Sequence, residues 1–339
     1  MKKWLLIIFL CISIAAGYTV WQIFIRPLTP PDKGYFYVPT NTKMADLKSS
    51  LLNQQIVQNS FFLNQVIKYG KFKTPRAGRY KISHSMSLLD LIKDLKRGNQ
   101  TPIKLVITKL RTKEDLAGKI GRQFEADSLQ VIQFLLNNDS LKKYETDTNT
   151  VMTLIIPNTY ELYWNGSFSR ILNRLKVEHD KFWTNERKEK ATAHGLTIGE
   201  VYTMASIVEE ETNILSDKPL IASVYINRLK KGMKLEADPT VKYASRNFGL
   251  TRILHGHLKF PSPYNTYYKA GLPPGPICTP SQQTIDAVLN APQTKYLFFV
   301  AKPDFSGYSN FAINYEEHKR FAKSYRQALD SLIISKQRQ

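Results

Sequence analysis

Cysteine is scarce in this chain of 339 residues, which contains only Cys11 and Cys278. Cys11 lies in an apolar stretch near the N-terminus and Cys278 lies far along the chain, so we expect no disulfide between them. This excludes a disulfide-rich scaffold, and the fold must depend on a hydrophobic core, which a chain of this length can supply. Internal repeats and low-complexity tracts are also missing, so a solenoid or a disordered chain is not expected.

Charge is missing from the 22 residues between Trp4 and Ile25, which read WLLIIFLCISIAAGYTVWQIFI. At about 1.5 Å per residue, a helix of this length covers the roughly 30 Å hydrocarbon core of a bilayer. Lys2 and Lys3 precede it, and this favours a cytoplasmic N-terminus. We therefore predict that residues 1–27 form a single-pass anchor in the cytoplasmic (inner) membrane, with the rest of the chain on the extracytoplasmic, periplasmic side.

Two other interpretations of this segment remain open. Ser13-Ile14-Ala15 fits a small-x-small cleavage site loosely, so the segment could be a signal peptide that is removed. The apolar run continues to Ile25 and is rimmed by Trp4 and Trp21, which favours a retained anchor. A buried core helix is disfavoured, because all faces are apolar and the segment stands at the N-terminus.

Motifs of nucleic-acid binding are absent, although the chain is strongly basic. Lys and Arg number 48 against 28 Asp and Glu, which gives a net charge of +20. The basic residues are dispersed, and no zinc-finger spacing, RNP-type aromatic motif or Gly-rich phosphate loop occurs. We predict no nucleic-acid partner and favour an anionic extracytoplasmic polymer or the membrane surface, with solubility as the alternative explanation of the charge.

The hydrophobic pattern predicts an α+β protein in two parts. After a proline-containing linker at 28–33, residues 35–108 read as strand, two helices, strand, helix and strand, which indicates a small α+β module. The remainder, 109–339, carries several amphipathic helical patterns and a closing helix near 315–334. We expect this larger part to be a second α+β domain.

An acidic triplet ends the most informative helical pattern, IGEVYTMASIVEEETN at 198–213. Met204 and Val208 mark its core face, and Glu209 lies on the neighbouring face beside small residues, which leave room for a ligand. Glu210 is expected to point toward solvent. Because adjacent carboxylates repel one another, a partly buried one among the three glutamates should have a raised pKa, as a general acid needs. A solvated acidic helix end is the alternative interpretation.

Downstream segments combine acid, aromatic and amide side chains with a rigid loop. Asp238 precedes Pro239 in a turn, Tyr264-Asn265-Thr266-Tyr267 follows, and Gly271–Ile277 contains three prolines and two glycines. Such a loop forms a wall without ladder hydrogen bonds of its own. Aromatic rings and amides beside it would suit a sugar-binding cleft, and a purely structural loop crossing is the alternative.

Together these motifs resemble the YceG-like (MltG) family of endolytic murein transglycosylases. The order and spacing of the segments match the family over nearly the whole exported part, and 28–108 resembles its LysM-like α+β subdomain. The larger domain, 109–339, then corresponds to the transglycosylase catalytic domain. Two positions depart from the family pattern. Asn158 stands where Asp is usual, and Ser309-Asn310-Phe311 replaces His-x-Phe, although His318 matches a later position.

The resemblance implies a lytic reaction on peptidoglycan. Similar enzymes cut nascent glycan strands between N-acetylmuramic acid and N-acetylglucosamine without water, leave 1,6-anhydro ends, and thereby end strand elongation. The family's catalytic glutamate maps onto Glu209, which would act as acid and then as base. Glu211 is expected to support the local structure. Asn158 is a candidate substrate contact. Further candidates for sugar binding, or for orienting Glu209, are Asp238, Tyr243, Tyr264 and Asn265, and a structural role is the alternative for each of these four.

No cofactor and no metal is predicted. His255 and His257 could point the same way on a strand, but no third ligand stands out, so surface histidines are the favoured interpretation. The resemblance implies peptidoglycan glycan strands as the partner, with peptidoglycan synthases as a further candidate.

Three alternative functions stay open at the level of sequence. Hydrolysis would follow if Asp238 faced the acid across the cleft and activated water. A non-enzymatic wall-binding scaffold and a membrane-anchored nucleic-acid binder are the other two.

Overall fold

The computed structural model describes residues 2–337, and these divide into two compact units. Unit 1 comprises the chain up to Leu105 together with Gly121–Asp127 and Tyr160–Ser169. Unit 2 comprises Val106–Ile120, Ser128–Thr159 and the chain from Arg170 onward. Both contain helices, and all the strands are short and paired two by two. The predicted mixture of helices and strands is confirmed.

The first helix of unit 1 is the predicted apolar segment. Helix α1 (Lys2–Val20) continues into a single π-helical segment, η1 (Trp21–Ile25). Over Lys2–Ile25 the helix is long and apolar enough to cross a membrane, and its apolar window is not buried by the protein. This is consistent with an anchor. A signal sequence has the same length and composition, so retention of the helix stays a prediction.

The end of this helix packs against unit 1. The Tyr18 and Phe62 rings lie 5.8 Å apart in an edge-on arrangement, and Gln22 is buried. The backbone N–H of Leu28 donates to the carbonyl of Met86 at 3.0 Å, and the Leu28 side chain is buried. The linker predicted at 28–33 is therefore wrong at its first residue, because Leu28 is part of the core.

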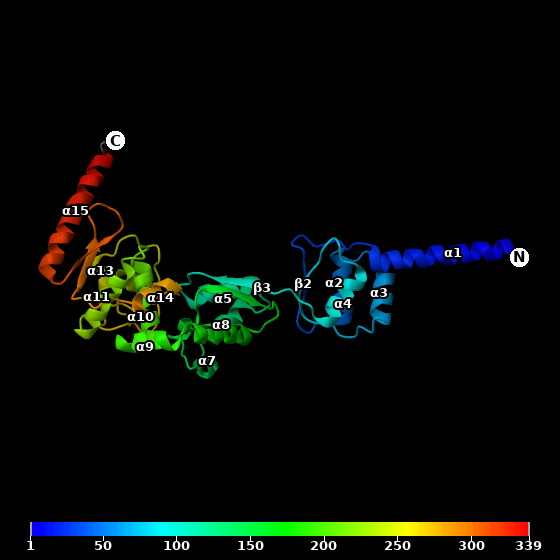
Figure 1. The fold of residues 1–339 in the computed structure, drawn as a ribbon, viewed down its shortest axis with the longest axis horizontal. Coiled ribbons are helices and arrows are strands. Elements are labelled where there is room, and N and C mark those ends of the chain that lie inside the picture. The colour runs from blue at the N-terminus through cyan, green and yellow to red at the C-terminus, as the bar shows by residue number, and fades with distance from the viewer. Residues whose placement is uncertain (1, 338–339) are drawn as a thin grey trace. The chain divides into compact units, whose positions relative to one another are not determined.

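A two-stranded antiparallel sheet with helices packed on it forms the centre of unit 1 (Figure 1). Strand β1 (Tyr35–Val38) pairs antiparallel with β2 (Gly78–Lys81), and Phe36 lies opposite Tyr80. The helices are α2 (Met44–Asn53) and α3 (Ser60–Tyr69), which lie between the strands in sequence, and α4 (Leu88–Arg97), which follows them. Alternate strand residues are buried, so one face of the sheet closes on these helices.

Helix α4 shows how local sequence fixes an element. The Ser87 hydroxyl oxygen accepts a hydrogen bond from the backbone N–H of Asp90, and the Asp90 carboxylate accepts one from the backbone N–H of Ser87, which makes a capping box. Gly98 ends the helix with φ of 78°, a left-handed conformation that glycine adopts readily. The buried side chains Leu88, Leu91, Ile92 and Leu95 recur at helical spacing.

A second two-stranded sheet joins β3 (Ile103–Ile107) to β4 (Asn158–Leu162). Several short helices of unit 2 come between these strands in sequence, and two longer ones follow. In chain order they are α5 (Lys113–Gln123), α6 (Ser128–Leu135), α7 (Asn138–Leu141), η2 (Lys142–Tyr144), η3 (Val151–Leu154), α8 (Phe168–Phe182) and α9 (Asn185–Ala193). Parts of α5 and α8 belong to unit 1.

Helix α10 (Ile198–Glu211) is the central element of unit 2. Every residue from Val201 to Val208 is buried, so this helix has core contacts on all sides. Helices α11 (Lys218–Lys230) and α14 (Gln282–Leu289) pack against it, and α12 (Asp238–Ala244) lies near its end. The short α13 (His255–Leu258) lies in an exposed loop region.

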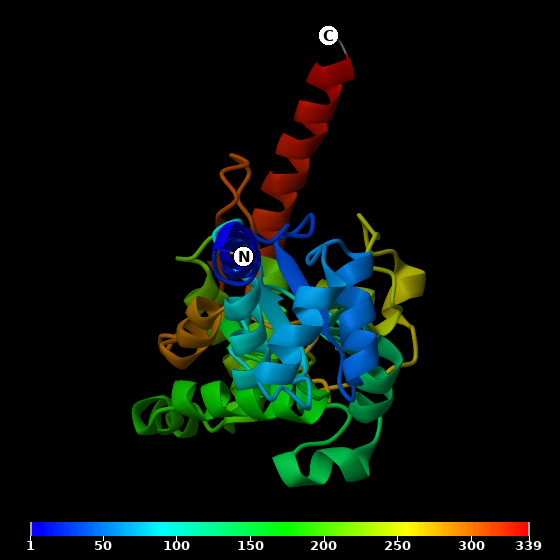
Figure 2. The ribbon, with the colours of Figure 1, turned by 90° about the vertical axis from the view of Figure 1, so that its right-hand side faces the viewer.

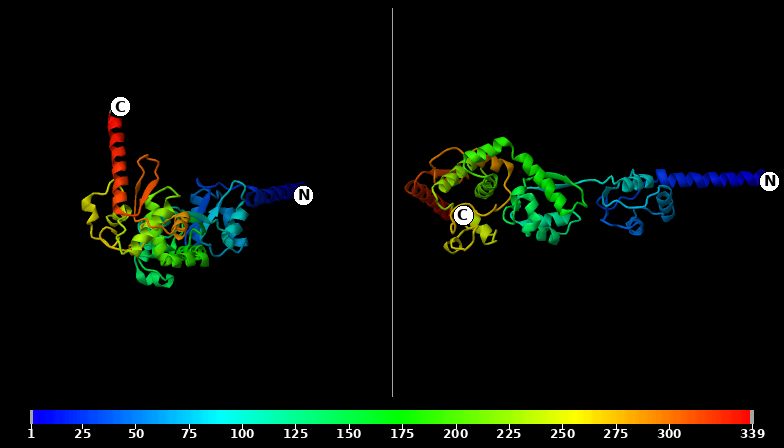
Figure 3. Two further views of the ribbon diagram at one scale, coloured as in Figure 1. Left: turned by 60° about the vertical axis from the view of Figure 1, so that its left-hand side comes forward. Right: turned by 90° about the horizontal axis from the view of Figure 1, so that it is seen from below.

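The chain closes with a hairpin and a long helix. Strand β5 (Phe298–Ala301) pairs antiparallel with β6 (Ser309–Ala312), with Phe298 opposite Ala312. Helix α15 (Tyr315–Gln337) packs against both strands at its beginning. Figures 2 and 3 show this helix in red beside the orange hairpin.

Removing the α4 cap should loosen that helix. We expect Ser87→Ala to speed amide hydrogen exchange across Leu88–Arg97 about fivefold, because a lost N-cap costs about 1 kcal/mol. Hydrogen-exchange mass spectrometry on the full chain measures this. Ser85→Ala is the control, since Ser85 is exposed and lies outside the helix. Equal exchange in the two variants would contradict the capping role.

Candidate active site

Helix α10 ends with three carboxylates, Glu209, Glu210 and Glu211, and negative charge is unfavourable at this end of a helix. The last carbonyls of a helix carry partial negative charge, so acidic side chains there need compensation. Successive residues turn by about 100°, so the three side chains leave the helix in different directions. Each of them therefore meets a different set of partners.

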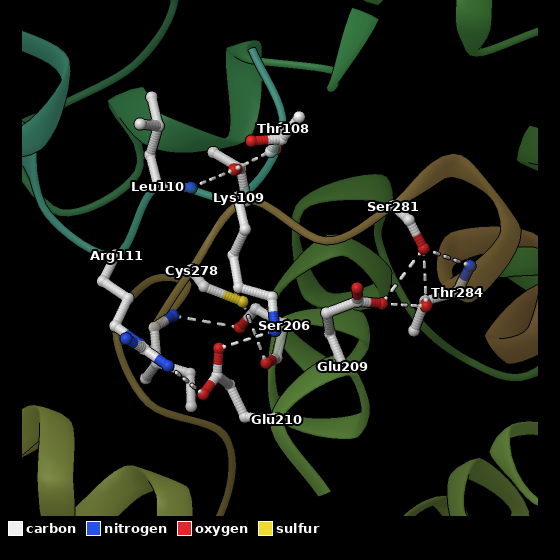
Figure 4. Close-up of polar contacts among 12 residues, drawn as sticks. Thr108, Lys109, Leu110, Arg111, Ser206, Glu209, Glu210, Cys278, Ser281 and Thr284 are labelled. Atoms are coloured by element: carbon white, nitrogen blue, oxygen red, sulfur yellow. Dashed lines mark hydrogen bonds and ion pairs between the residues drawn. The ribbon is translucent and has the colours of Figure 1, made fainter. Parts of the chain in front are cut away.

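Glu209 is held in an ion pair. Its Oε2 lies 2.8 Å from the Lys218 ammonium and accepts hydrogen bonds from Ser281 Oγ at 3.0 Å and from Thr284. Lys218 also donates to Thr284 Oγ1 at 2.6 Å. Figure 4 shows the contacts of Ser281 and Thr284 with this one oxygen, while the other carboxylate oxygen points away from them.

This environment keeps Glu209 ionised. Burial alone would raise the pKa of Glu209, but the hydrogen bonds from Lys218, Thr284 and Ser281 and the charge of Lys218 outweigh it and hold the pKa below its ordinary value. Glu209 is therefore not the member of the triplet with the predicted raised pKa. The sequence pattern showed the neighbouring acids, but it did not show that a lysine nine residues later would meet this one.

Glu209 lines a cleft with a volume of about 430 Å³. The structure brings the predicted Asn158 to the same cleft. The other lining residues are Val106, Ile107, Thr108, Lys109, Pro157, Thr159, Thr279 and Ser281. The cleft thus combines an ionised carboxylate with hydroxyl, amide and apolar groups.

Glu210 does not point into solvent as predicted. Its carboxylate lies 3.0 Å from both the Lys109 ammonium and the Arg111 guanidinium, and its side chain is 15% exposed. Figure 4 shows the segment Thr108–Arg111 passing over the end of α10, which brings these two cations to the acid. Burial opposes ionisation of Glu210, but its two cationic partners prevail and lower its pKa.

Glu211 is the member of the triplet whose pKa is raised. Burial and the nearby negative charge of Asp238 raise the pKa of Glu211 to about 7, although a hydrogen bond from Tyr225 and the charge of Lys242 act in the opposite direction. The Tyr225 hydroxyl donates to Glu211 Oε1 at 2.7 Å. A carboxyl group of this kind is substantially protonated near neutral pH, which is the state that a general acid requires.

A second cavity opens beside Glu211, with a volume of about 300 Å³. It joins residues from four of the sequence motifs, together with aromatic side chains of the hairpin and α15. The lining residues are Glu211, Arg228, Leu235, Glu236, Asp238, Tyr267, Phe298, Phe299, Tyr315 and His318. Asp238 Oδ1 accepts a hydrogen bond of 2.8 Å from the Tyr267 hydroxyl. We refer to this cavity as the Glu211 pocket.

Arg228 lines this pocket and forms hydrogen bonds to two of the segments that surround it. Its Nε donates to the carbonyl of Leu297 at 2.7 Å, and Nη1 donates to the carbonyl of Leu235 at 2.9 Å. Nη1 also pairs with the Glu236 carboxylate at 3.0 Å, and the guanidinium lies 5.0 Å from the centre of the Phe298 ring. One side chain of α11 therefore fixes both the hairpin and the segment that leads to Asp238.

Asn265 is placed where it supports a loop. The residue has 0% exposure, and its amide donates to the carbonyls of Leu258 at 3.0 Å and Phe260 at 2.9 Å. Its Oδ1 accepts the backbone N–H of Tyr267 at 3.0 Å. These bonds leave no surface for a sugar, so the structure does not support substrate contact by Asn265.

Tyr243 and Tyr264 form a pair of their own. Their ring centres lie 4.8 Å apart, and neither residue lines the Glu209 cleft or the Glu211 pocket. Burial raises the pKa of both phenols. Sugar binding by these two rings stays a prediction that the geometry does not strengthen.

The two histidines of the His-x-His pair lie on α13, and His257 accepts the backbone N–H of Leu254 at 3.2 Å. Within residues 2–337 there is no group of three His, Cys, Asp or Glu side chains placed to hold a metal ion.

Sequence reasoning missed several residues of the Glu211 pocket. His318 was noted only as a family match, yet it stacks on Phe298 with ring centres 5.2 Å apart. Its pKa is lowered by burial and by the charge of Arg228, which favours the neutral imidazole. The contact of Tyr225 with Glu211 could not be predicted from helical spacing, because the two residues lie on different helices.

The chain is similar in sequence to a known protein family. The profile of the YceG-like family matches residues 36–324. The chain belongs to the YceG-like family. Two relatives named endolytic murein transglycosylase are each 28% identical to it. The match to the Bacillus subtilis protein covers 85% of this chain and 83% of the relative, and the match to the Streptococcus pneumoniae protein covers 93% and 63%.

The family fold is supported by a solved structure. A crystal structure of a YceG-like protein from Listeria monocytogenes is similar to this chain with a TM-score of 0.55 and 28% sequence identity. The match covers 84% of this chain and 98% of that one. The chain thus matches less than two thirds of the length of the pneumococcal relative and nearly all of the Listeria structure.

The raised pKa of Glu211 should be visible in the pH dependence of stability. The folded protein keeps this proton up to about pH 7, whereas the unfolded chain loses it near 4.3, so Glu211 makes stability fall as pH rises through this window. Glu211→Gln cannot titrate and should gain on the order of 1–3 kcal/mol relative to the parent between pH 5 and pH 8.

Urea denaturation at both pH values, followed by fluorescence, measures this difference. Glu209→Gln is the matched comparison and should show no such gain. The lowered pKa of Glu209 adds stability above the unfolded value near 4.3, and that stability is lost as pH falls through the lower folded pKa. A pH-independent difference between the parent and Glu211→Gln would refute the raised pKa.

Proposed function

We propose that this protein is an endolytic peptidoglycan lytic transglycosylase with its reaction centre at the Glu211 pocket. The substrate is the glycan strand of peptidoglycan, and the bond cut is the one between N-acetylmuramic acid and N-acetylglucosamine. Family membership and the names of the relatives support the reaction class. The observation that carries the assignment of the site is a carboxyl group with a pKa of about 7 in a pocket lined by aromatic and polar side chains.

We assign the general acid to Glu211 in place of Glu209. A general acid must hold a proton at the working pH, and in the ligand-free protein the Lys218 ion pair lowers the pKa of Glu209 and favours its carboxylate form. Glu211 has no cationic hydrogen-bond partner among the described residues, and the Tyr225 hydroxyl that contacts it is neutral. In this proposal Glu209 anchors the end of α10 to α11 and α14, while Glu211 does the chemistry.

The reaction follows from one carboxyl group that acts twice. Protonated Glu211 gives its proton to the glycosidic oxygen, and the bond from that oxygen to the anomeric carbon breaks as positive charge develops on the sugar ring. The carboxylate that remains takes the proton of the muramic acid C6 hydroxyl, and its oxygen bonds to the anomeric carbon. Glu211 is then protonated again, no water is consumed, and the product has a 1,6-anhydro end.

The neighbouring groups have distinct tasks in this scheme. The carboxylate of Asp238, oriented by the Tyr267 hydroxyl, raises the proton affinity of Glu211 and favours positive charge on the reacting ring. Tyr225 holds the carboxyl group of Glu211 in one orientation. Phe298, Phe299 and Tyr315 offer apolar surface to sugar rings. Hydrolysis is the alternative outcome, with Asp238 as the base that activates water.

The apolar N-terminal helix supports an activity at a membrane. A retained α1 would hold the protein in the cytoplasmic membrane as a single-pass anchor, with the chain that follows this helix on the extracytoplasmic side. There the enzyme would meet nascent strands, and cutting them would end their elongation beside the synthases that extend them. The segment 28–108, with its strand–helix–helix–strand order, is proposed as a LysM-like glycan-binding part, and 109–339 as the catalytic domain.

The three glutamates of the triplet provide a matched mutational test. Glu211→Gln should lower the release of anhydro-ended fragments from purified sacculi by at least 100-fold, since it cannot donate a proton. Glu209→Gln and Glu210→Gln should keep activity within about tenfold of the parent, as neither removes the proton donor. Mass spectrometry of the products measures both the yield and the loss of one water relative to hydrolytic ends.

Circular dichroism and the thermal midpoint establish that each variant is folded. Loss of activity in Glu209→Gln with full activity in Glu211→Gln would return the acid to Glu209. Products with ordinary reducing ends would replace the lytic reaction with hydrolysis. Full activity in both variants would remove the triplet from the mechanism.

The pH profile supplies a separate check on the acid. Because the protonated form of Glu211 is required, kcat/KM should fall above an apparent pKa near 7. Asp238→Asn removes the nearby negative charge and should move this limb to lower pH, because the carboxylate of Glu211 becomes easier to form. A fixed limb in Asp238→Asn would contradict the coupling of the two acids.

A further inference from the structure

One stretch of unit 1 is entirely free of acidic residues. Between Leu47 and Leu89 the chain contains seven lysines and arginines and no aspartate or glutamate. The basic side chains Lys68, Lys71, Lys73 and Arg76 are exposed and follow one another at the end of α3 and in the segment after it. Such a local excess of positive charge attracts an anionic surface.

The exposed face of α3 adds aromatic side chains to this charge. Phe61 is 60% exposed and Tyr69 is 78% exposed, and they stand at the two ends of the helix. Asn64 and Lys68 lie between them at helical spacing and are also exposed, whereas Phe62, Leu63, Val66 and Ile67 are buried in the core. Exposed aromatic and lysine side chains on one helical face are typical of a helix that lies in the interface of a membrane.

Contacts within unit 1 place α3 beside the end of the apolar anchor helix. The Tyr18 ring of α1 packs on Phe62 with ring centres 5.8 Å apart, and Phe61 packs on Phe62 at 5.3 Å. Arg26, just after the helix, contacts Gln58, which precedes α3. Figure 1 shows α3 running across the end of α1, on the side of unit 1 from which α1 projects. A helix that crosses the end of a membrane span lies along the membrane surface.

We propose that α3 and the basic segment up to Arg76 form a docking surface for anionic lipid headgroups of the membrane that holds α1. Phe61 and Tyr69 enter the headgroup region, and Lys68, Lys71 and Lys73 pair with lipid phosphates. Because η1 and Leu28 are packed into unit 1, the anchor and this surface act together. Unit 1 is thereby held flat on the membrane instead of swinging on a free linker.

A depth measurement on the full chain tests this surface. An environment-sensitive fluorophore is attached at Asn64→Cys, or at Lys43→Cys as the control, in a Cys11→Ala background, where the remaining Cys278 is buried. The protein is reconstituted in phosphatidylcholine vesicles with or without about one third phosphatidylglycerol. We expect brominated lipids to quench the Asn64 label several-fold more than the Lys43 label, and most strongly with phosphatidylglycerol.

Charge-reversal variants then distinguish lipid binding by this local surface from an effect of the protein's net charge. Changing Lys68, Lys71 and Lys73 to glutamate should abolish the difference between the two lipids. The same change at Lys93, Arg97 and Lys104, which are exposed elsewhere in unit 1, should leave it in place. Equal loss in both triple variants, or equal quenching of the two labels, would overturn the proposal. The readout does not depend on catalysis, so it stands apart from the assignment of Glu211.

Discussion

Unit 2 depends on how the end of α10 accommodates three adjacent carboxylates. They stand where the helix carbonyls already concentrate negative charge, so each must be compensated or protonated. Lys218 neutralises Glu209, and Lys109 with Arg111 neutralises Glu210. Glu211 receives only the neutral Tyr225 hydroxyl and stays protonated up to about pH 7. The two neutralised acids fix the helix end to its surroundings, and the third is the one whose pKa is raised.

The pocket beside Glu211 is assembled from segments that are far apart in sequence. Arg228 on α11 binds the carbonyls of Leu297 and Leu235, so it holds the hairpin and the segment before Asp238 in one place. The carboxylate of Asp238 then lies near enough to raise the pKa of Glu211. Arg228 does not contact Glu211, but it influences the pKa of Glu211 because it holds the segment that carries Asp238.

Much of the architecture followed from local signals. The apolar helix, the strand–helix–helix–strand order of the small unit and the helix ending in the glutamate triplet were all predictable from periodicity and caps. The linker predicted at 28–33 was wrong at its first residue. Leu28 enters the core, and its backbone N–H bonds to the carbonyl of Met86, a contact that no local pattern encodes. The burial of Asn265 could not be predicted for a similar reason, as a polar residue in a polar segment gives no sign that its amide will be buried.

By itself, the sequence determined the apolar N-terminal helix, the alternation of helices and strands, and the position of three consecutive glutamates at the end of one helix. Those features depend on residue type and spacing along a single segment. Only the tertiary structure decided which glutamate keeps a proton, because the pKa of each is set by Lys218, Lys109, Arg111, Tyr225 and Asp238, brought in from other segments. Proton affinity is a property of the surrounding charges and burial, and these exist only after the chain has folded.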